Sequence, residues 1–180
     1  MNIEYESRIL EVDKQKAIDK LKSLNASFVG EYNYTRYVYD TKPVRKNKWI
    51  RLRSDGKKTT LTFKEFKSKS IDGTNELEIE VSDLDKTKEF LKILGYTPRS
   101  IQENQRTRYN LNGVEIDIDS WPFIPTFIEV EGKNEMEVNK VINILKDCGK
   151  EVTNLDVQGI YEKYGYKKED INYLSFKGDE

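Results

Sequence analysis

The stretch Glu4-Tyr5-Glu6-Ser7-Arg8, close to the start of the chain, has the alternation of a β-strand. Successive strand side chains point to opposite faces, so Glu4, Glu6 and Arg8 share one face at a spacing of about 7 Å. A single charged strand face usually meets water. This one is informative because the same arrangement returns in most of the other extended segments, and the fold prediction rests on that repetition.

The rest of the chain alternates strand patterns with amphipathic helix patterns. We expect strands at 4–8, 34–40, 48–54, 59–66, 75–81, 104–111, 114–119 and 126–131. We expect helices at 13–25, at 83–94 and from 134 to 149, with a short one at 156–164. Eight strands are about the number that closes a barrel with room inside for side chains or one small ligand. At 180 residues, the chain is predicted to be one domain, 1–180.

Three local signals mark where these elements begin and end. Ser82 is the expected N-cap of the second helix, and Gly95 is its expected C-terminal stop. Asn112-Gly113 predicts a two-residue hairpin turn between two strands. The segment 121–125 contains two prolines and predicts a loop before the last strand.

Composition excludes several classes of site. The chain has 31 basic and 32 acidic residues, which argues against a general electrostatic surface for nucleic acid or membranes. Histidine is absent, so the commonest general base and the usual zinc ligand are missing. Cys148 is the only cysteine, which excludes an internal disulfide and predicts a buried, inert thiol. No signal peptide or long apolar run is present, so we expect a cytoplasmic protein.

The charged strand faces separate by sign, while their opposite faces are largely apolar. Acidic faces carry Glu4/Glu6, Glu76/Glu78/Glu80, Glu115/Asp117/Asp119 and Glu129/Glu131. Basic positions are Arg8, Arg51, Arg53, Lys64, Arg106 and Arg108. On pattern alone, an open sheet with a solvated charged face is the commoner arrangement. Runs of like charge are a poor design for such a face, however, and eight open strands would leave exposed edges. Both points favour a barrel with its charged face inside.

A charged interior would need ligands of both signs. Converging carboxylates raise one another's pKa unless a cation neutralises them, and oxygen ligands suit Mg²⁺ or Mn²⁺. The six strand cations need an anion of several charges, such as a di- or triphosphate held by arginine forks. Metal and basic clamp together are the general solution for phosphoryl transfer.

The order and spacing of these motifs resemble the CYTH superfamily of triphosphate tunnel metalloenzymes. Its members include class IV adenylate cyclases, thiamine triphosphatases and inorganic triphosphatases. The resemblance covers Glu4 to about Tyr161. The matching pieces are Glu4-Tyr5-Glu6-Ser7-Arg8 for Glu-x-Glu-x-Lys, Arg51-Leu52-Arg53, Thr62-Phe63-Lys64, the acidic strand 75–80, Arg106-Thr107-Arg108, and Asp119 ten residues before Glu129-Val130-Glu131.

The resemblance implies an α+β fold, an eight-stranded antiparallel closed barrel with a charged interior and flanking helices. It implies Mg²⁺ or Mn²⁺ held by Glu4, Glu6, Asp119, Glu129 and Glu131 with one of Glu78 or Glu80. It implies a triphosphate bound by Arg8, Arg51, Arg53, Lys64, Arg106 and Arg108. Arg8 and Lys64 are the candidate catalytic cations, whereas Glu76 and Glu115 are expected at the rim.

Arg8 departs from the family pattern, which has lysine there. Lysine can shed a proton and act as a base, but arginine effectively cannot. Arg8 can still bind a phosphate or position a carboxylate. The identity of a general base therefore stays open.

The leading hypothesis is a metal-dependent enzyme that hydrolyses inorganic triphosphate, a nucleoside triphosphate or thiamine triphosphate. The second is a class IV-type adenylate cyclase that converts ATP to cyclic AMP and pyrophosphate. Well-known members of that class carry a His-Phe pair before the opening motif, and this chain has no histidine. The third is a non-catalytic module that binds polyphosphate or a nucleotide, against which both Glu-x-Glu pairs argue. The expected partner is a triphosphate-containing small molecule, not nucleic acid or a membrane, and a homodimer is left open.

Overall fold

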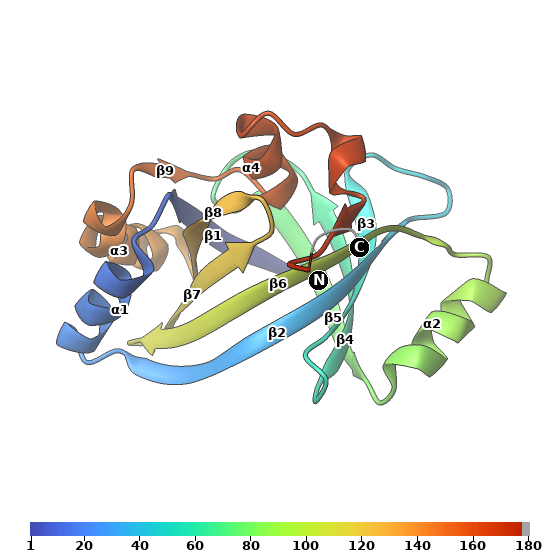
Figure 1. The fold of residues 1–180 in the computed structure, drawn as a ribbon, viewed down its shortest axis with the longest axis horizontal. Helices are drawn as coiled ribbons and strands as arrows, with labels where there is room; N and C mark the ends of the chain where they lie inside the picture. The colour runs from blue at the N-terminus through green and yellow to red at the C-terminus, as the bar shows by residue number, and fades with distance from the viewer. Residues whose placement is uncertain (178–180) are drawn as a thin grey trace.

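The computed structural model describes residues 1–177, in which ten strands form one sheet (Figure 1). The eight long strands are β1 (Asn2–Leu10), β2 (Ser27–Asp40), β3 (Lys48–Ser54), β4 (Thr59–Phe66), β5 (Thr74–Val81), β6 (Pro98–Leu111), β7 (Val114–Trp121) and β8 (Ile124–Gly132). The helices are α1 (Lys14–Ser23), α2 (Leu84–Ile93), α3 (Glu135–Leu145) and α4 (Val157–Lys163), with 3-10 turns η1 (Lys146–Cys148) and η2 (Lys168–Ile171). Two short strands complete the set, β9 (Glu151–Thr153) and β10 (Tyr173–Leu174).

The eight long strands close into an antiparallel barrel. Neighbours follow the order β6-β2-β3-β4-β5-β1-β8-β7, and β7 pairs again with β6. This confirms the predicted closed eight-stranded barrel. Strands β2 and β6 are longer than predicted, because they pair with each other from Ser27 opposite Asn110 to Tyr39 opposite Pro98. Gly30 and Pro98 interrupt the local strand pattern there, and only the long-range pairing completes it.

The apolar outer face of the barrel packs against helices on two sides. Strands β1, β7 and β8 form the largest core with α1 and α3, in which Ile9, Ile116, Ile128, Val138 and Leu145 are buried. Helix α2 covers β3 separately through Leu91, which packs with Tyr39 and Leu52. Figure 1 shows α2 at the opposite end of the molecule from α1 and α3. Because the helices bury the apolar face, the charged strand face is turned inward.

The local signals predict most helix ends and turns correctly, but they misplace the N-cap of α2. Asp83, not Ser82, is the N-cap of α2, and its carboxylate accepts a hydrogen bond from the Lys86 N–H. Gly95 ends that helix with φ 82°, as predicted. The Asn112-Gly113 turn is confirmed, with both residues in the left-handed region. At the other end of β7, the sequence predicts a loop over 121–125.

That loop prediction for 121–125 is wrong. Trp121 pairs with Ile124, so only Pro122 and Phe123 form the connection, and Phe123 has φ 67°. Proline fits this turn because β7 and β8 need no backbone N–H from residue 122. The short turn keeps Trp121 on the barrel wall, where it is buried.

The segment after α3 runs across one end of the barrel. Strand β9 pairs with β1, and β10 adds a parallel pairing to β6 (Figure 1). Between them, α4 packs Ile160 and Tyr161 against Leu10, Trp121 and Phe127. Cys148, just before β9, is a buried free thiol, as predicted. In residues 1–177, no helix is long and apolar enough to cross a membrane.

Candidate active site

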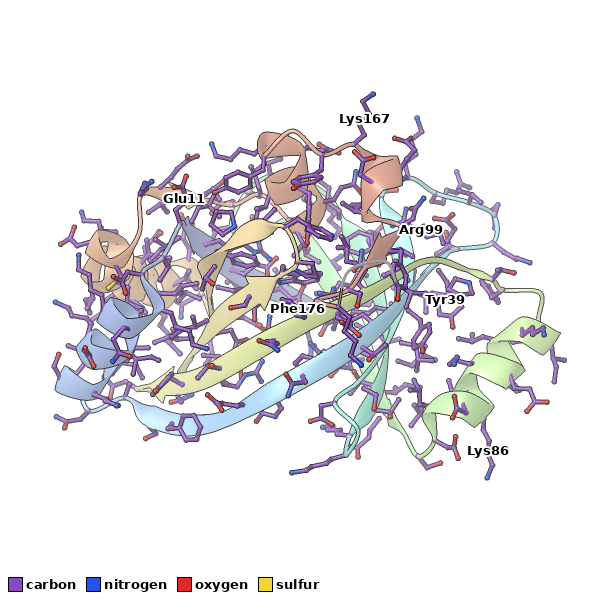
Figure 2. All side chains as sticks on the ribbon, viewed as in Figure 1. Glu11, Tyr39, Lys86, Arg99, Lys167 and Phe176 are labelled. Carbon is purple, nitrogen blue, oxygen red and sulfur yellow. The ribbon has the colours of Figure 1, made fainter. Side chains whose placement is uncertain are left out.

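The barrel encloses a cavity of about 790 Å³ that side chains from all eight long strands line. Figure 2 shows Lys86 on α2 extending away from the molecule. Residues 154–159 and η2 add to the lining at the end that the C-terminal segment covers. Arg99, the second residue of β6, lies at that end and pairs with Asp40 at 3.4 Å (Figure 2).

The interior is divided into two halves of opposite charge. We call β6, β2, β3 and β4 the basic half, because their cavity-lining charges are all lysines and arginines. We call β5, β1, β8 and β7 the acidic half, whose lining charges are carboxylates apart from Arg8. The two halves meet at two seams, one between β6 and β7 and the other between β4 and β5.

At the β6–β7 seam the arginines of Arg106-Thr107-Arg108 are fully paired. Arg106 donates a two-pronged fork to Asp119 at 2.7 and 2.6 Å, and it also contacts Asp117 and Glu129. Arg108 pairs with Asp117 at 2.8 Å and with Glu115 at 2.7 Å. Burial alone would lower the pKa of Arg106, but these carboxylates raise it well above its usual value.

At the β4–β5 seam Lys64 joins two carboxylates. Its ammonium lies 2.9 Å from both oxygens of Glu4 and 2.8 Å from Glu76. Burial raises the pKa of Glu4 to about 8 against the effect of Lys64, and Glu6 and Glu76 add to the rise. Glu76 was expected at the rim, but the structure places it in this cluster, because β5 starts at the end of the cavity that Lys64 reaches.

The other acidic residues of β5 differ in position. Glu78 lines the cavity, accepts a hydrogen bond from Thr62 at 2.7 Å and lies 3.3 Å from Arg51. Glu80 lies outside the cavity lining and forms an exposed ion pair with Lys58 at 3.2 Å. Strand alternation gives all three glutamates one face, but the tilt of barrel strands carries the end of β5 past the edge. The structure does not bring Glu80 to the predicted metal cluster.

Arg8 is the one cation that belongs to the acidic half itself. Its guanidinium contacts Glu6 at 3.0 Å and Glu129 at 2.6 Å, and it donates to the Leu155 carbonyl at 2.9 Å. Burial would raise the pKa of Glu129, but Arg8, Arg106 and Lys64 hold it well below its usual value. Arg8 therefore positions the carboxylates on β1 and β8 and connects them to the C-terminal segment.

Glu131 is surrounded mainly by other carboxylates. It lies directly opposite Glu6 across the β1–β8 pairing, and within the described chain no cation pairs with it. Burial raises the pKa of Glu131 to about 7, with contributions from Glu129, Glu6 and Glu115. A buried carboxylate of this kind suits a hard divalent cation with oxygen ligands.

The donor set fits such an ion, although it is not already arranged around one. In the part of the chain that the structure describes, no three carboxylates converge as they would around a bound metal. Lys64 and Arg8 bind the oxygens of Glu4 and Glu6 instead. Binding would therefore require these carboxylates to exchange a protein cation for the metal.

Sequence reasoning missed several residues of the cavity lining, Arg99 and Asn104 on β6 among them. The most informative of these residues is Arg36 on β2. It lies opposite Arg53 on β3, lines the cavity and stacks over the Trp121 ring at 4.6 Å. A signal was present, because Thr35-Arg36-Tyr37 repeats Thr107-Arg108-Tyr109, which supplied a predicted phosphate ligand. The lining residues of the C-terminal segment gave no comparable charge pattern.

Comparison with known proteins gives a consistent result. The model of a family described as CYTH domain matches residues 2–159. The "putative adenylate cyclase" of Methanocaldococcus jannaschii is 26% identical over 175 residues, covering 88% of this chain and 99% of that protein. A conserved hypothetical protein from Pyrococcus furiosus superposes with a TM-score of 0.74 at 24% identity, covering 87% of this chain and 99% of that one.

A further solved structure, from Hippeastrum, is also similar. The "putative adenylyl cyclase" of Hippeastrum, described as having a dominant triphosphatase activity, has a TM-score of 0.60 and 16% identity. The match covers 93% of this chain and 97% of that chain. At these identities the solved structures establish the shared barrel.

Proposed function

The chain belongs to the CYTH domain family, and we propose that it is a divalent-metal-dependent enzyme that hydrolyses a triphosphate bound inside its barrel. The observation that carries the proposal is the division of one cavity into a basic and an acidic half. A triphosphate needs cations along its oxygens, and a metal that neutralises it needs carboxylates on its other side. The cavity has cations on one wall and carboxylates on the other.

In this proposal the basic half binds and orients the phosphates. Arg51 and Arg53 reach the cavity from the same face of β3 and are only weakly paired with Glu78, at 3.3 and 3.8 Å. Arginine forks match phosphate oxygens in shape and stay charged at every working pH. Arg106, Arg108 and Lys64 hold the seams and add positive potential around the ligand.

The acidic half would hold Mg²⁺ or Mn²⁺ through Glu4, Glu6 and Glu131, with Glu129 and Asp119 beside them. When bound, the metal would neutralise phosphate charge and favour ionisation of a water molecule. Arg8 keeps Glu6 and Glu129 in position and, as an arginine, holds its proton. Hydrolysis breaks the bond between the terminal phosphorus and its bridging oxygen, and it releases orthophosphate and a diphosphate.

A cyclase that converts ATP to cyclic AMP and pyrophosphate is the second candidate. The name of the Methanocaldococcus jannaschii relative favours it, whereas the activity described for the Hippeastrum protein favours hydrolysis. A non-catalytic polyphosphate-binding module is disfavoured, because it would have no use for the buried acidic half. A homodimer, the lack of a nucleic-acid partner and a cytoplasmic location stay predictions.

The test is incubation with Mg²⁺ or Mn²⁺ and, separately, tripolyphosphate, ATP and thiamine triphosphate. We expect orthophosphate release from at least one of them. Cyclic AMP with pyrophosphate would select the cyclase, and binding without turnover would select the module. The double variant Glu4→Gln/Glu6→Gln should lose metal-dependent turnover while keeping its circular dichroism spectrum. Lys58→Gln, outside the cavity, serves as the matched control and should keep full activity.

A further inference from the structure

The cations of the cavity are not equally free to bind a ligand. Four of them each lie within 3.0 Å of two carboxylates: Arg8, Lys64, Arg106 and Arg108. Arg106 also contacts a third carboxylate, Glu129, at 3.1 Å. Arg51 lies farther from its carboxylates, at 3.3 Å from Glu78 and 3.8 Å from Glu76. Arg53 lies 3.8 Å from Glu78. An anion competes with carboxylates at every one of these residues, and least at Arg53.

Arg36 differs from all of them. Within residues 1–177, no carboxylate lies at ion-pair distance from its guanidinium, and its buried Nε has no hydrogen-bond acceptor. Burial, together with Arg51, Arg53 and Arg106, lowers the pKa of Arg36 well below its usual value. Arg36 is only partly buried, and the charge of Asp119 offsets part of this effect without forming an ion pair. A cation without an ion-pair partner among three other guanidinium groups is a favourable place for an anion.

The surroundings of Arg36 hold further unpaired polar atoms. Trp121 is 3% exposed, and its indole N–H has no acceptor. Asn104 on β6 is 2% exposed, and its side-chain oxygen has no donor. Both residues line the cavity on the strands that follow β2 around the barrel. The unpaired Arg36 and Trp121 donors point to a ligand with acceptor oxygens.

We propose that Arg36 is the principal anion-binding cation of the free cavity, and that it binds non-bridging oxygens of the phosphate chain. This inference rests on the proposed function and specifies which residue recognises its substrate class. Trp121 is a positioning residue, because it stacks on the guanidinium and thereby fixes the plane of the fork. Tyr161 packs edge-on against Trp121 at 6.4 Å and donates to the Pro122 carbonyl, which holds the indole in place.

In this proposal, the leading role in phosphate binding belongs to an arginine that is not among those the sequence motifs predict. Arg36 and Arg53 lie opposite each other in the β2–β3 register, so one phosphate group can contact both. The Tyr34 ring lies 4.6 Å from the Arg53 guanidinium and supports it in the same way. Arg106 and Arg108, in contrast, remain bound to their carboxylates and act mainly through their charge.

The test measures binding apart from turnover. Tripolyphosphate is titrated calorimetrically into the metal-free protein in the presence of a chelator. We expect Arg36→Gln to weaken binding about 10- to 100-fold, the range for losing charge-assisted hydrogen bonds. Arg36→Lys keeps the charge but not the fork, and it should recover part of the loss. Arg45→Gln removes one exposed arginine outside the cavity lining and should bind like the wild type.

Thermal unfolding gives a second readout that a purely structural role would not produce. Because Arg36 is a partly buried charge without an ion-pair partner, the ligand-free Arg36→Gln protein should unfold at a temperature equal to or above that of the wild type. The rise in unfolding temperature on adding tripolyphosphate should shrink in the same variant. Equal tripolyphosphate affinity in wild type and Arg36→Gln would overturn this inference alone. Failure of the wild type to bind tripolyphosphate, ATP and thiamine triphosphate would overturn the proposed function and this inference with it.

Discussion

The basic and the acidic half of the barrel bury their charges in different ways. The acidic half contains its own counter-ion, because Arg8 lies between Glu6 and Glu129. The basic half has no carboxylate of its own in the cavity lining and depends on the seams. Its central cation, Arg36, is left without a partner in the described structure. The free protein is therefore ready to take up an anion, whereas a metal must first displace protein cations.

The largest effect should come from breaking a seam between the two halves. Arg106→Met would leave Asp117, Asp119 and Glu129 without their shared cation, and the first two are at most 2% exposed. Removing one partner of a buried ion-pair network costs about 3–5 kcal/mol. Urea denaturation should show a loss of this size in the free energy of unfolding.

Lys58→Met is the matched control for the seam variant. It breaks the exposed pair with Glu80 on the outside of the cavity, which should cost at most about 1 kcal/mol. A loss in Arg106→Met no larger than in the control would show that the seam does not stabilise the barrel.

An intermediate effect should come from pH, because the acidic half holds carboxyl groups with raised pKa values. Burial raises the pKa of Glu131 to about 7 and the pKa of Glu4 to about 8, from the ordinary value of 4.5. Between pH 4.5 and these raised pKa values, the folded state binds more protons than the unfolded state. The free energy of unfolding therefore falls as the pH rises. We expect the Glu131 carboxyl alone to cost the metal-free protein about 2–3 kcal/mol between about pH 5 and about pH 8.

Glu131→Gln should flatten this pH profile, since an amide stays neutral throughout. Histidine is absent, so no imidazole titrates in the same interval. Thermal unfolding across the interval, in a chelator, measures the profile of both proteins. An unchanged slope in Glu131→Gln would argue that its pKa is not raised.

The smallest effect should come from Arg8→Lys, which restores the residue of the family pattern. The variant keeps a positive charge between Glu6 and Glu129 but cannot contact both and the Leu155 carbonyl as the guanidinium does. We expect a loss of about 1 kcal/mol in unfolding free energy and turnover within a few-fold of the wild type. A large gain in turnover would instead indicate that the family lysine acts as a base.

Strand alternation predicted the barrel well where both faces of a strand carried a clear signal. The bounds of β3 and β4 match the expected 48–54 and 59–66, and the closed barrel is confirmed. Alternation alone could not tell Glu76 from Glu80, because it assigns a face but not a depth. Depth depends on strand tilt and register, which long-range pairing sets.

Arg36 escaped prediction for a related reason. It stands alone among tyrosines on β2, whereas Arg51 with Arg53 and Arg106 with Arg108 form Arg-x-Arg pairs. Its position opposite Arg53 and above Trp121 follows from pairing partners that are distant in sequence. The role of the C-terminal segment in lining the cavity likewise depends on β9 and β10 finding their partner strands.

The pairing of β1 with β8 also determines when the cavity can exist during synthesis. Arg8 and Glu129 are 121 residues apart, so the first strand leaves the ribosome long before its partner. Chains emerge from their N-terminus, and contacts this distant in sequence form slowly. The carboxylates of β1 therefore remain in water, away from the charges of β8, until the barrel closes. We expect burial of the charged interior to be one of the last events of folding.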